Sequence, residues 1–168
     1  MDDNYAPKSA FLLNLAHGDI PLSGSQFAEQ NVKLLISFMR DSDLSNRDWA
    51  TMLLSTTEID TPRVRAALIS ATQDEDAEVR AEALEGLAIR NELSVLPMLK
   101  KELLGDTCAY GTFVAARLAA HPSLLPSLRK WASQPNLGSH VRSAINDAIL
   151  ACNASVGNPR DWTVQGGC

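Results

Sequence analysis

Four basic side chains recur at matched places in two similar stretches of the sequence, and they are the first candidates for binding chemistry. Lys100 and Lys101 end the first stretch, and Arg129 and Lys130 take the same places 29 residues later. A repeated fold is expected to place them side by side as one strip, which predicts a partner with an acidic segment. The alternative is that they stabilise helix C-termini, where each cation gains ~0.3–1 kcal/mol from the dipole. Trp131 follows directly, and we expect it half exposed as an anchor for the same partner.

Residues typical of catalysis or metal binding are present, but they lack the arrangement that such chemistry needs. No nucleophile elbow frames a serine, and no glycine-rich phosphate loop occurs. The histidines are far apart, and the cysteines are scattered and odd in number, which fits neither a metal site nor a disulfide framework. These residues are His17, His121, His140, Cys108, Cys152 and Cys168. The sequence therefore predicts no enzyme activity, no metal and no cofactor.

The charge balance limits the classes of partner. The formal net charge is −5, and an acidic protein repels phosphate backbones at long range, so we expect no nucleic-acid binding. One stretch concentrates acidic side chains, which either recruit a basic partner or form a solvated helix face. Its members are Asp74, Glu75, Asp76, Glu78, Glu82 and Glu85.

The elements that position these side chains are predicted from a repeated pattern. Residues 74–88 read as an acidic turn followed by a helix, with Asp76 as the N-cap and an apolar stripe that includes Leu84 and Leu87. The pattern returns 33 residues earlier, around Arg47, and continues in weaker copies from Asp106 and Ser139. Each first helix is followed by a second one, and two helices in about 30 residues, repeated, are typical of an all-α solenoid.

The pattern divides the chain into three segments. Residues 1–40 lack the repeat motif and are predicted to form an N-terminal helical cap, since solenoid ends need an atypical unit to cover an apolar face. Residues 41–152 are predicted to be the repeats, and residues 153–168 a loose tail in which Trp162 is the residue able to dock. The expected helices are 7–16, 25–39, 45–56, 61–72, 77–89, 93–104, 109–120, 123–133 and 139–152.

The motif Asp-x-Asp-x-x-Val-Arg-x-x-Ala-x-x-x-Leu at residues 74–87 resembles the HEAT repeat. Its compact form is similar to the short HEAT-like units of phycobilisome lyases. The resemblance covers roughly Asp41 to Cys152, and Thr112 stands where the third copy departs from the motif's arginine. It implies an α–α superhelix, a right-handed α-solenoid whose second helices line a concave binding face. That face would carry the basic strip.

The same resemblance implies a structural ladder in which arginines hydrogen-bond the acidic turns of adjacent units. A guanidinium fork matches carboxylate geometry, and we expect Arg80 to bind Asp41 or Asp43 of the preceding unit. The alternative is a set of solvent-exposed helix charges, and neither interpretation makes the arginines catalytic. The predicted ladder residues are Asp41, Asp43, Arg47, Asp74, Asp76, Arg80 and Arg142.

Function and location follow as expectations. The N-terminus has no basic region or long apolar core, and the apolar runs are too short to span a bilayer, so we expect a cytoplasmic protein without membrane contact. The predicted function is a non-enzymatic scaffold or adaptor for a protein or peptide, including a regulatory or immunity-type binder. The alternative, implied by the resemblance, is a protein that handles an open-chain tetrapyrrole, as phycobilin lyases do.

Overall fold

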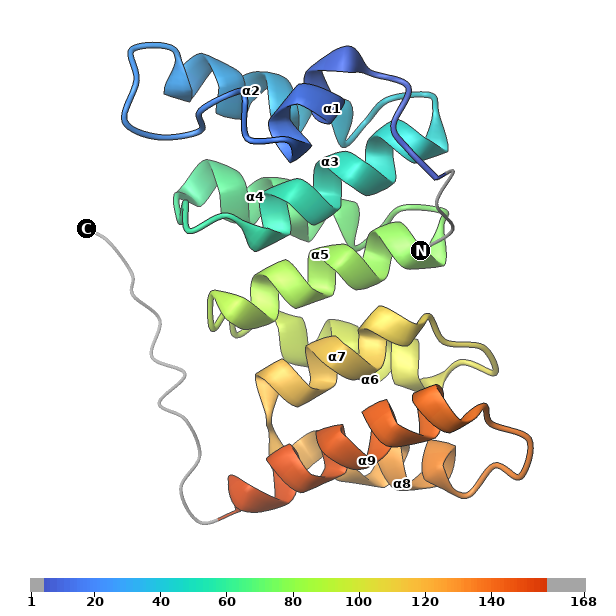
Figure 1. The fold of residues 1–168 in the computed structure, drawn as a ribbon. Coiled ribbons are helices and arrows are strands. Elements are labelled where there is room, and N and C mark those ends of the chain that lie inside the picture. The colour runs from blue at the N-terminus through green and yellow to red at the C-terminus, as the bar shows by residue number, and fades with distance from the viewer. Residues whose placement is uncertain (1–4, 157–168) are drawn as a thin grey trace. The chain divides into compact units, whose positions relative to one another are not determined.

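The computed structural model describes residues 5–156, and all regular secondary structure in that range is helical. This confirms the predicted all-α class for the described residues. The chain divides into two compact units, Met1–Ala83 and Leu84–Cys168, and the boundary falls inside one helix. Figure 1 labels the helices of both units.

The first unit consists of two helical hairpins and the start of a fifth helix. Its helices are α1 (Ala10–Ala16), α2 (Ala28–Phe38), α3 (Leu44–Thr56), α4 (Pro62–Ala71) and the first turns of α5 (Ala77–Ile89). In this unit α3 packs against α1, α2 and α4. Leu12, Leu35, Leu54 and Leu68 come from these four helices and have no solvent exposure, so they form the core of the unit.

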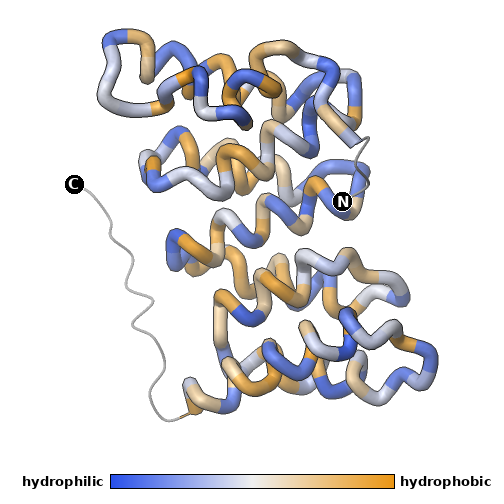
Figure 2. The backbone as a smooth tube through the Cα atoms, in the orientation of Figure 1, coloured by the Kyte–Doolittle hydropathy of each residue, from blue (hydrophilic) through white to orange (hydrophobic). Residues whose placement is uncertain are grey.

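The second unit continues from α5 with two further hairpins. It contains α6 (Val95–Leu104), α7 (Tyr110–Ala119), the short 3-10 turn η1 (Pro122–Leu124), α8 (Leu125–Ala132) and α9 (Ser139–Ala154). Here α9 packs against both α7 and α8, and α6 packs against α7 and α8. The fully buried side chains of Leu99, Phe113, Leu128 and Ile145 fill the space between them. Figure 2 shows the apolar segments along the helices.

Side-chain caps explain why several helices begin where the sequence predicts. The Asp76 carboxylate accepts from the backbone N–H of Glu78 at 2.9 Å, as expected of an N-cap that satisfies a free donor in the first turn. Thr61 caps α4 in the same way, and Pro62 occupies the first helical position, where its missing N–H costs nothing. Gly18 follows α1 with φ +84°, a left-handed conformation that is common just after the end of a helix.

All nine predicted helices are present, with differences at their ends. α1 and α2 each begin three residues later than expected, at Ala10 and Ala28. α9 extends to Ala154, two residues beyond the predicted end. From residue 157 onward the predicted tail, including Trp162, lies outside the described residues. No helix within residues 5–156 combines the length and hydropathy that crossing a membrane requires.

Candidate protein-binding surface

The basic strip, defined as Lys100, Lys101, Arg129 and Lys130, lies on α6 and α8 of the second unit. All four side chains are exposed, and the two helices that carry them pack against each other. None of the four forms an ion pair with another residue in the described range 5–156. One contact restrains Arg129, whose Nη2 donates to Asn153 Oδ1 at 3.5 Å. The strip therefore offers cationic donors that no described carboxylate neutralises.

His121 lies in the turn before α8, near enough to Lys100 on α6 for the lysine charge to act on its ring. Its Nδ1 accepts from the backbone N–H of Ser123 at 3.2 Å, so the ring caps η1. Burial lowers the pKa of His121, and the nearby charge of Lys100 lowers it further. Both effects favour the neutral imidazole at pH 7. The positive charge of this surface consequently comes from the lysines and Arg129.

Trp131 is not part of the exposed surface, and the expectation that it is half exposed is wrong. Only 5% of the residue is exposed. The indole N–H donates to the carbonyl oxygen of Leu103 at 2.9 Å, and the ring packs edge-on against Phe113 with centroids 5.5 Å apart. Leu124, Leu128 and Trp131 follow an i, i+4, i+7 spacing, a buried stripe that the sequence already displays. Trp131 therefore holds α6 and α8 together and supplies no anchor for a partner.

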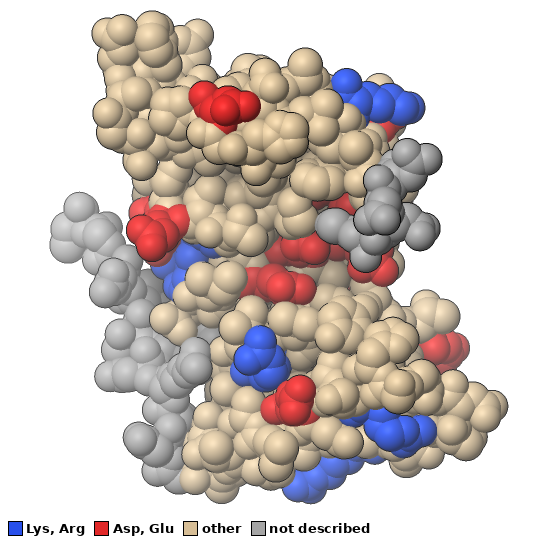
Figure 3. Space-filling model, in the orientation of Figure 1, with Lys and Arg blue, Asp and Glu red and all other residues tan. Residues whose placement is uncertain are grey.

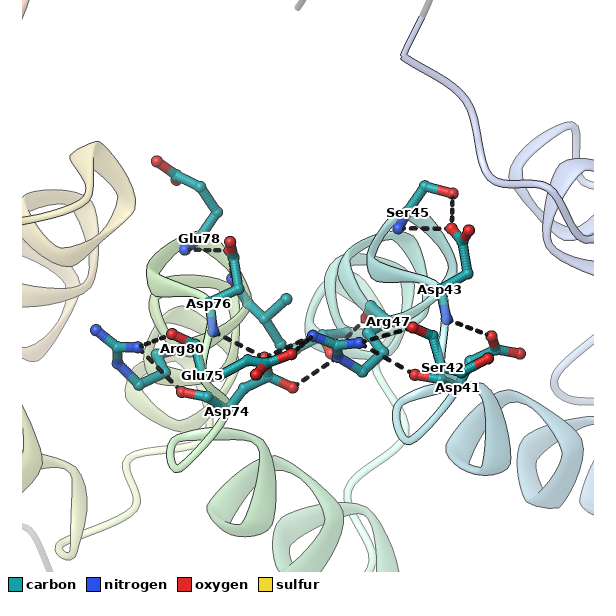
Figure 4. Close-up of polar contacts among 12 residues, drawn as sticks. Asp41, Ser42, Asp43, Ser45, Arg47, Asp74, Glu75, Asp76, Glu78 and Arg80 are labelled. Carbon is teal, nitrogen blue, oxygen red and sulfur yellow. Dashed lines mark hydrogen bonds and ion pairs between the residues drawn. The ribbon is translucent and has the colours of Figure 1, made fainter.

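The acidic turns before α3 and α5 have the same internal geometry. Asp41 Oδ1 accepts from the N–H of Asp43 at 2.8 Å, and Asp74 Oδ1 accepts from the N–H of Asp76 at 2.9 Å. Figure 4 shows both turns with the arginine that follows each of them. The first aspartate of each turn fixes the loop, and the second caps the helix. The repeated aspartates thus have a structural role within each turn.

Arg47 joins one acidic turn to the next. Its Nε and Nη2 donate to the two carboxylate oxygens of Asp74 at 2.9 and 3.2 Å, and Nη2 also reaches Glu75 Oε1 at 3.1 Å. Nη1 donates to the carbonyl oxygen of Asp41 at 3.1 Å. The hydrogen bond to Asp74 raises the pKa of Arg47. A bidentate pair whose side chains are each 11% exposed ties the two turns of the first unit together.

The direction of this link is opposite to the prediction. The arginine of the earlier turn reaches forward to Asp74, whereas we expected Arg80 to reach back to Asp41 or Asp43. Asp43 instead pairs with Lys8, and this contact, with the hydrogen bond from Ser45, lowers the pKa of Asp43 to about 2. Arg80 Nη1 donates to the carbonyl oxygen of Asp74 in its own turn at 3.0 Å.

Arg142 also binds the loop that precedes its own helix, but this loop contains no acidic side chain. Its Nη1 donates to the carbonyl oxygen of Ala132 at 3.2 Å, and Nη2 donates to that of Gln134 at 3.1 Å. These contacts fasten the loop before α9 through main-chain oxygens, so the predicted partnership of Arg142 with acidic side chains is wrong. At the corresponding place in α7, Thr112 is 1% exposed and belongs to the core.

A group of acidic side chains lies on the first unit near the starts of α3 and α5. Burial is the main cause that raises the pKa values of Asp48 and Glu78, and neighbouring carboxylates, including Asp76, raise them further. Tyr5 donates a hydrogen bond to Asp48, which lowers the pKa of that carboxyl, while burial raises the pKa of Tyr5 to about 12. Figure 3 shows acidic side chains gathered near α5.

Replacing Asp48 with asparagine is expected to stabilise the protein at pH 7. A carboxyl whose pKa is raised by folding costs stability when it is ionised, and that cost disappears as the pH falls below the pKa of the unfolded chain. Because Asp48 keeps part of its solvent contact, we expect a gain of a few tenths of a kcal/mol at pH 7. Thermal unfolding of Asp48→Asn and wild type at pH 7 and pH 4 measures it.

The gain should shrink at the lower pH. Tyr5→Phe is the companion variant, since removing the hydrogen bond should raise the pKa of Asp48 and move the pH dependence upward. An Asp48→Asn protein that is less stable than wild type at pH 7 would contradict this account of the cluster.

The described residues contain neither a disulfide bond nor a cluster of metal-binding side chains. Burial raises the pKa of the Cys152 thiol to about 11, so this thiol is a poor nucleophile at neutral pH. Cys108 is partly exposed, and Cys168 lies outside the described residues. Within residues 5–156, no group of three or more His, Cys, Asp or Glu side chains is arranged to hold a metal ion.

Sequence reasoning missed three contacts of these surfaces. Lys8 and Tyr5 come from the N-terminal segment and contact Asp43 and Asp48, and no repeat signal links them to those aspartates. Glu75 was assigned only to the acidic stretch, although it accepts from Arg47. Its position beside Asp74, in a turn that faces the preceding arginine, is the signal that identifies it.

Comparison with known proteins supports the repeat assignment. Residues 32–111 match the family model of HEAT repeats. YibA of Escherichia coli strain K12 is 32% identical over 97 residues, which are 58% of this chain and 35% of YibA. YibA of strain O157:H7 gives the same values. The narrower resemblance to phycobilisome lyases stays a prediction.

The fold likeness extends further than the sequence match. The X-ray structure of YibA superimposes with a TM-score of 0.57 and 25% identity, over 80% of this chain and 53% of the YibA chain. The matched part of the chain thus spans about a third of the length of these relatives by sequence, and about half of the solved chain. The helical hairpins are those of an α-solenoid.

Proposed function

We propose that the protein is a non-enzymatic scaffold that binds a partner protein or peptide, because residues 32–111 match the family model of HEAT repeats. Stacked helical repeats present extended surfaces, and such surfaces suit the recognition of another chain. This role needs only side-chain contacts with the partner and requires neither a catalytic constellation nor a cofactor. The thiols of Cys108 and Cys152 fit a reducing cytoplasm as the place of action.

The binding surface in this proposal is the basic strip on the second helices α6 and α8. The observation that carries it is the set of four exposed cations without a described ion-pair partner, in a chain whose net charge is −5. Local positive charge within an acidic protein favours a partner with a locally acidic segment, because polyanions at large are repelled by the remaining surface. The partner is therefore a protein or peptide with clustered Asp and Glu.

Reversing charge at Lys101 and Lys130 is expected to weaken such binding about tenfold or more, because two attractive contacts become repulsive. The probe is a fluorescein-labelled poly-glutamate peptide, titrated with wild type and with the Lys101→Glu, Lys130→Glu double variant. Fluorescence anisotropy measures the affinity. For wild type, affinity should also fall as the salt concentration rises.

The matched control reverses Arg40 and Arg63, two exposed cations of the first unit that lie outside the strip. It changes the net charge equally, so long-range effects are the same in both double variants. Retained affinity in the control, with unchanged thermal stability in both, supports the proposal. Equal weakening by the two double variants would show that net charge alone governs binding. It would refute the proposal that the basic strip is the binding surface.

A further inference from the structure

A groove of about 490 Å³ runs between α7 and α9 in the second unit. The two helices run in the same direction in Figure 1, and near their first residues the rings of Tyr110 and His140 lie tilted against each other with centroids 5.9 Å apart. The groove is lined by apolar side chains together with one cation and one anion. Its lining includes Tyr110, Val114, Arg117, Asp147, Leu150 and Ala151.

The lining leaves large apolar side chains open to water. Leu150 is 66% exposed and Tyr110 is 47% exposed, and no described residue covers them. Arg117 and Asp147 are also exposed, and neither forms an ion pair within the described range. An apolar groove with an unpaired charge of each sign fits an occupant with a large apolar side chain and both charges.

We propose that residues 157–168 of the same chain occupy this groove, with Trp162 as the anchor. The segment, which lies outside the described residues, contains Arg160, Asp161 and Trp162 in succession. Trp162 matches the apolar lining, because a tryptophan side chain buries about 150–250 Å². Arg160 and Asp161 match Asp147 and Arg117 in charge. The segment therefore carries a large apolar side chain and a charge of each sign, which complement the lining.

The length of the connecting chain permits this docking. Trp162 is the sixth residue after Val156, and an extended chain of six residues reaches about 20 Å. Leu150 precedes the end of α9 at Ala154 by four residues, or about 6 Å along the helix, and Asp147 precedes it by about 10 Å. Trp162 therefore reaches both. A short tether also raises the effective concentration of the segment to the millimolar range, so a modest intrinsic affinity suffices.

The test follows the indole N–H signals of the three tryptophans by ¹⁵N NMR in the full chain. Trp49, Trp131 and Trp162 give one signal each, and Trp162→Phe assigns the third. Docking predicts that hydrogen exchange at the Trp162 indole is slowed by about tenfold or more relative to a free indole, as expected of a tethered, mostly bound segment. An unprotected Trp162 signal in wild type overturns the proposal.

Leu150→Arg should abolish this protection by filling the groove with a charged side chain. Leu104→Arg is the matched control, because Leu104 is also 66% exposed but lies on α6 away from the groove. Protection lost equally in both variants, or retained in Leu150→Arg, contradicts docking in the groove.

A charge exchange tests the polar part of the proposal. Asp147→Arg should reduce the protection of Trp162, and adding Arg160→Asp should restore it. Failure of this rescue would overturn the proposed orientation of the segment. Protection that increases with protein concentration would overturn docking within one chain, since it would place the segment in the groove of a second copy.

Discussion

Replacing Leu84 or Leu87 with alanine is expected to lower the free energy of unfolding by ~2–5 kcal/mol in each case. Both side chains lie on α5, at positions predicted from the apolar stripe, and neither has any solvent exposure. The substitution removes buried methyl and methylene groups and leaves a cavity that the surrounding helices fill only in part. Urea denaturation measures the loss, with the slope of the transition checked for a change in the unfolded state.

Leu104→Ala provides the control for this pair. It removes the same groups from a leucine that is 66% exposed, and we expect a change within about 0.5 kcal/mol. Similar losses at Leu84, Leu87 and Leu104 would mean that burial does not distinguish these leucines, which would contradict the described phase of α5.

Arg47→Ala is expected to cost ~3–5 kcal/mol, because it leaves the Asp74 carboxylate largely buried without its partner. The substitution also removes the hydrogen bonds to Glu75 and to the carbonyl oxygen of Asp41. Arg47→Lys should recover only part of the loss, since an ammonium group cannot form the bidentate pair with Asp74. Chemical denaturation of the three proteins compares them.

Arg65→Ala is the matched arginine control. Arg65 also pairs with an aspartate, Asp60, but the side chains are 27% and 42% exposed. An exposed pair contributes ~0.2–1 kcal/mol, so the loss should be several times smaller than at Arg47. Equal losses at the two arginines would show that burial does not increase the contribution of the Arg47–Asp74 pair to the free energy of unfolding.

Most of the fold could be predicted because each repeat carries local signals. The stripe around Leu84 and Leu87 sets the phase of α5, and Asp76 and Pro62 mark helix starts through capping chemistry that involves only neighbouring residues. The starts of α1 and α2 were harder to predict, because these helices lie outside the repeated pattern and no side chain caps their first turn.

The surfaces were predicted less completely, since they depend on contacts between segments distant in sequence. The repeat register placed the basic strip on α6 and α8, where its side chains are exposed. The same reasoning misjudged Trp131, because a helix-end position suggested exposure while the carbonyl group of Leu103 offered a buried hydrogen-bond partner. Register alone could not decide whether an arginine reaches the preceding or the following turn. Arg47 reaches forward to Asp74.

The most direct test of the proposed function maps where an acidic peptide binds. Backbone NMR signals of the ¹⁵N-labelled protein are followed while unlabelled poly-glutamate peptide is added. Binding at the basic strip predicts saturable shifts that concentrate on α6 and α8, including Lys101 and Lys130, and that weaken as salt is raised. Shifts that concentrate on α3 and α5, or the absence of any saturable shift, would contradict it.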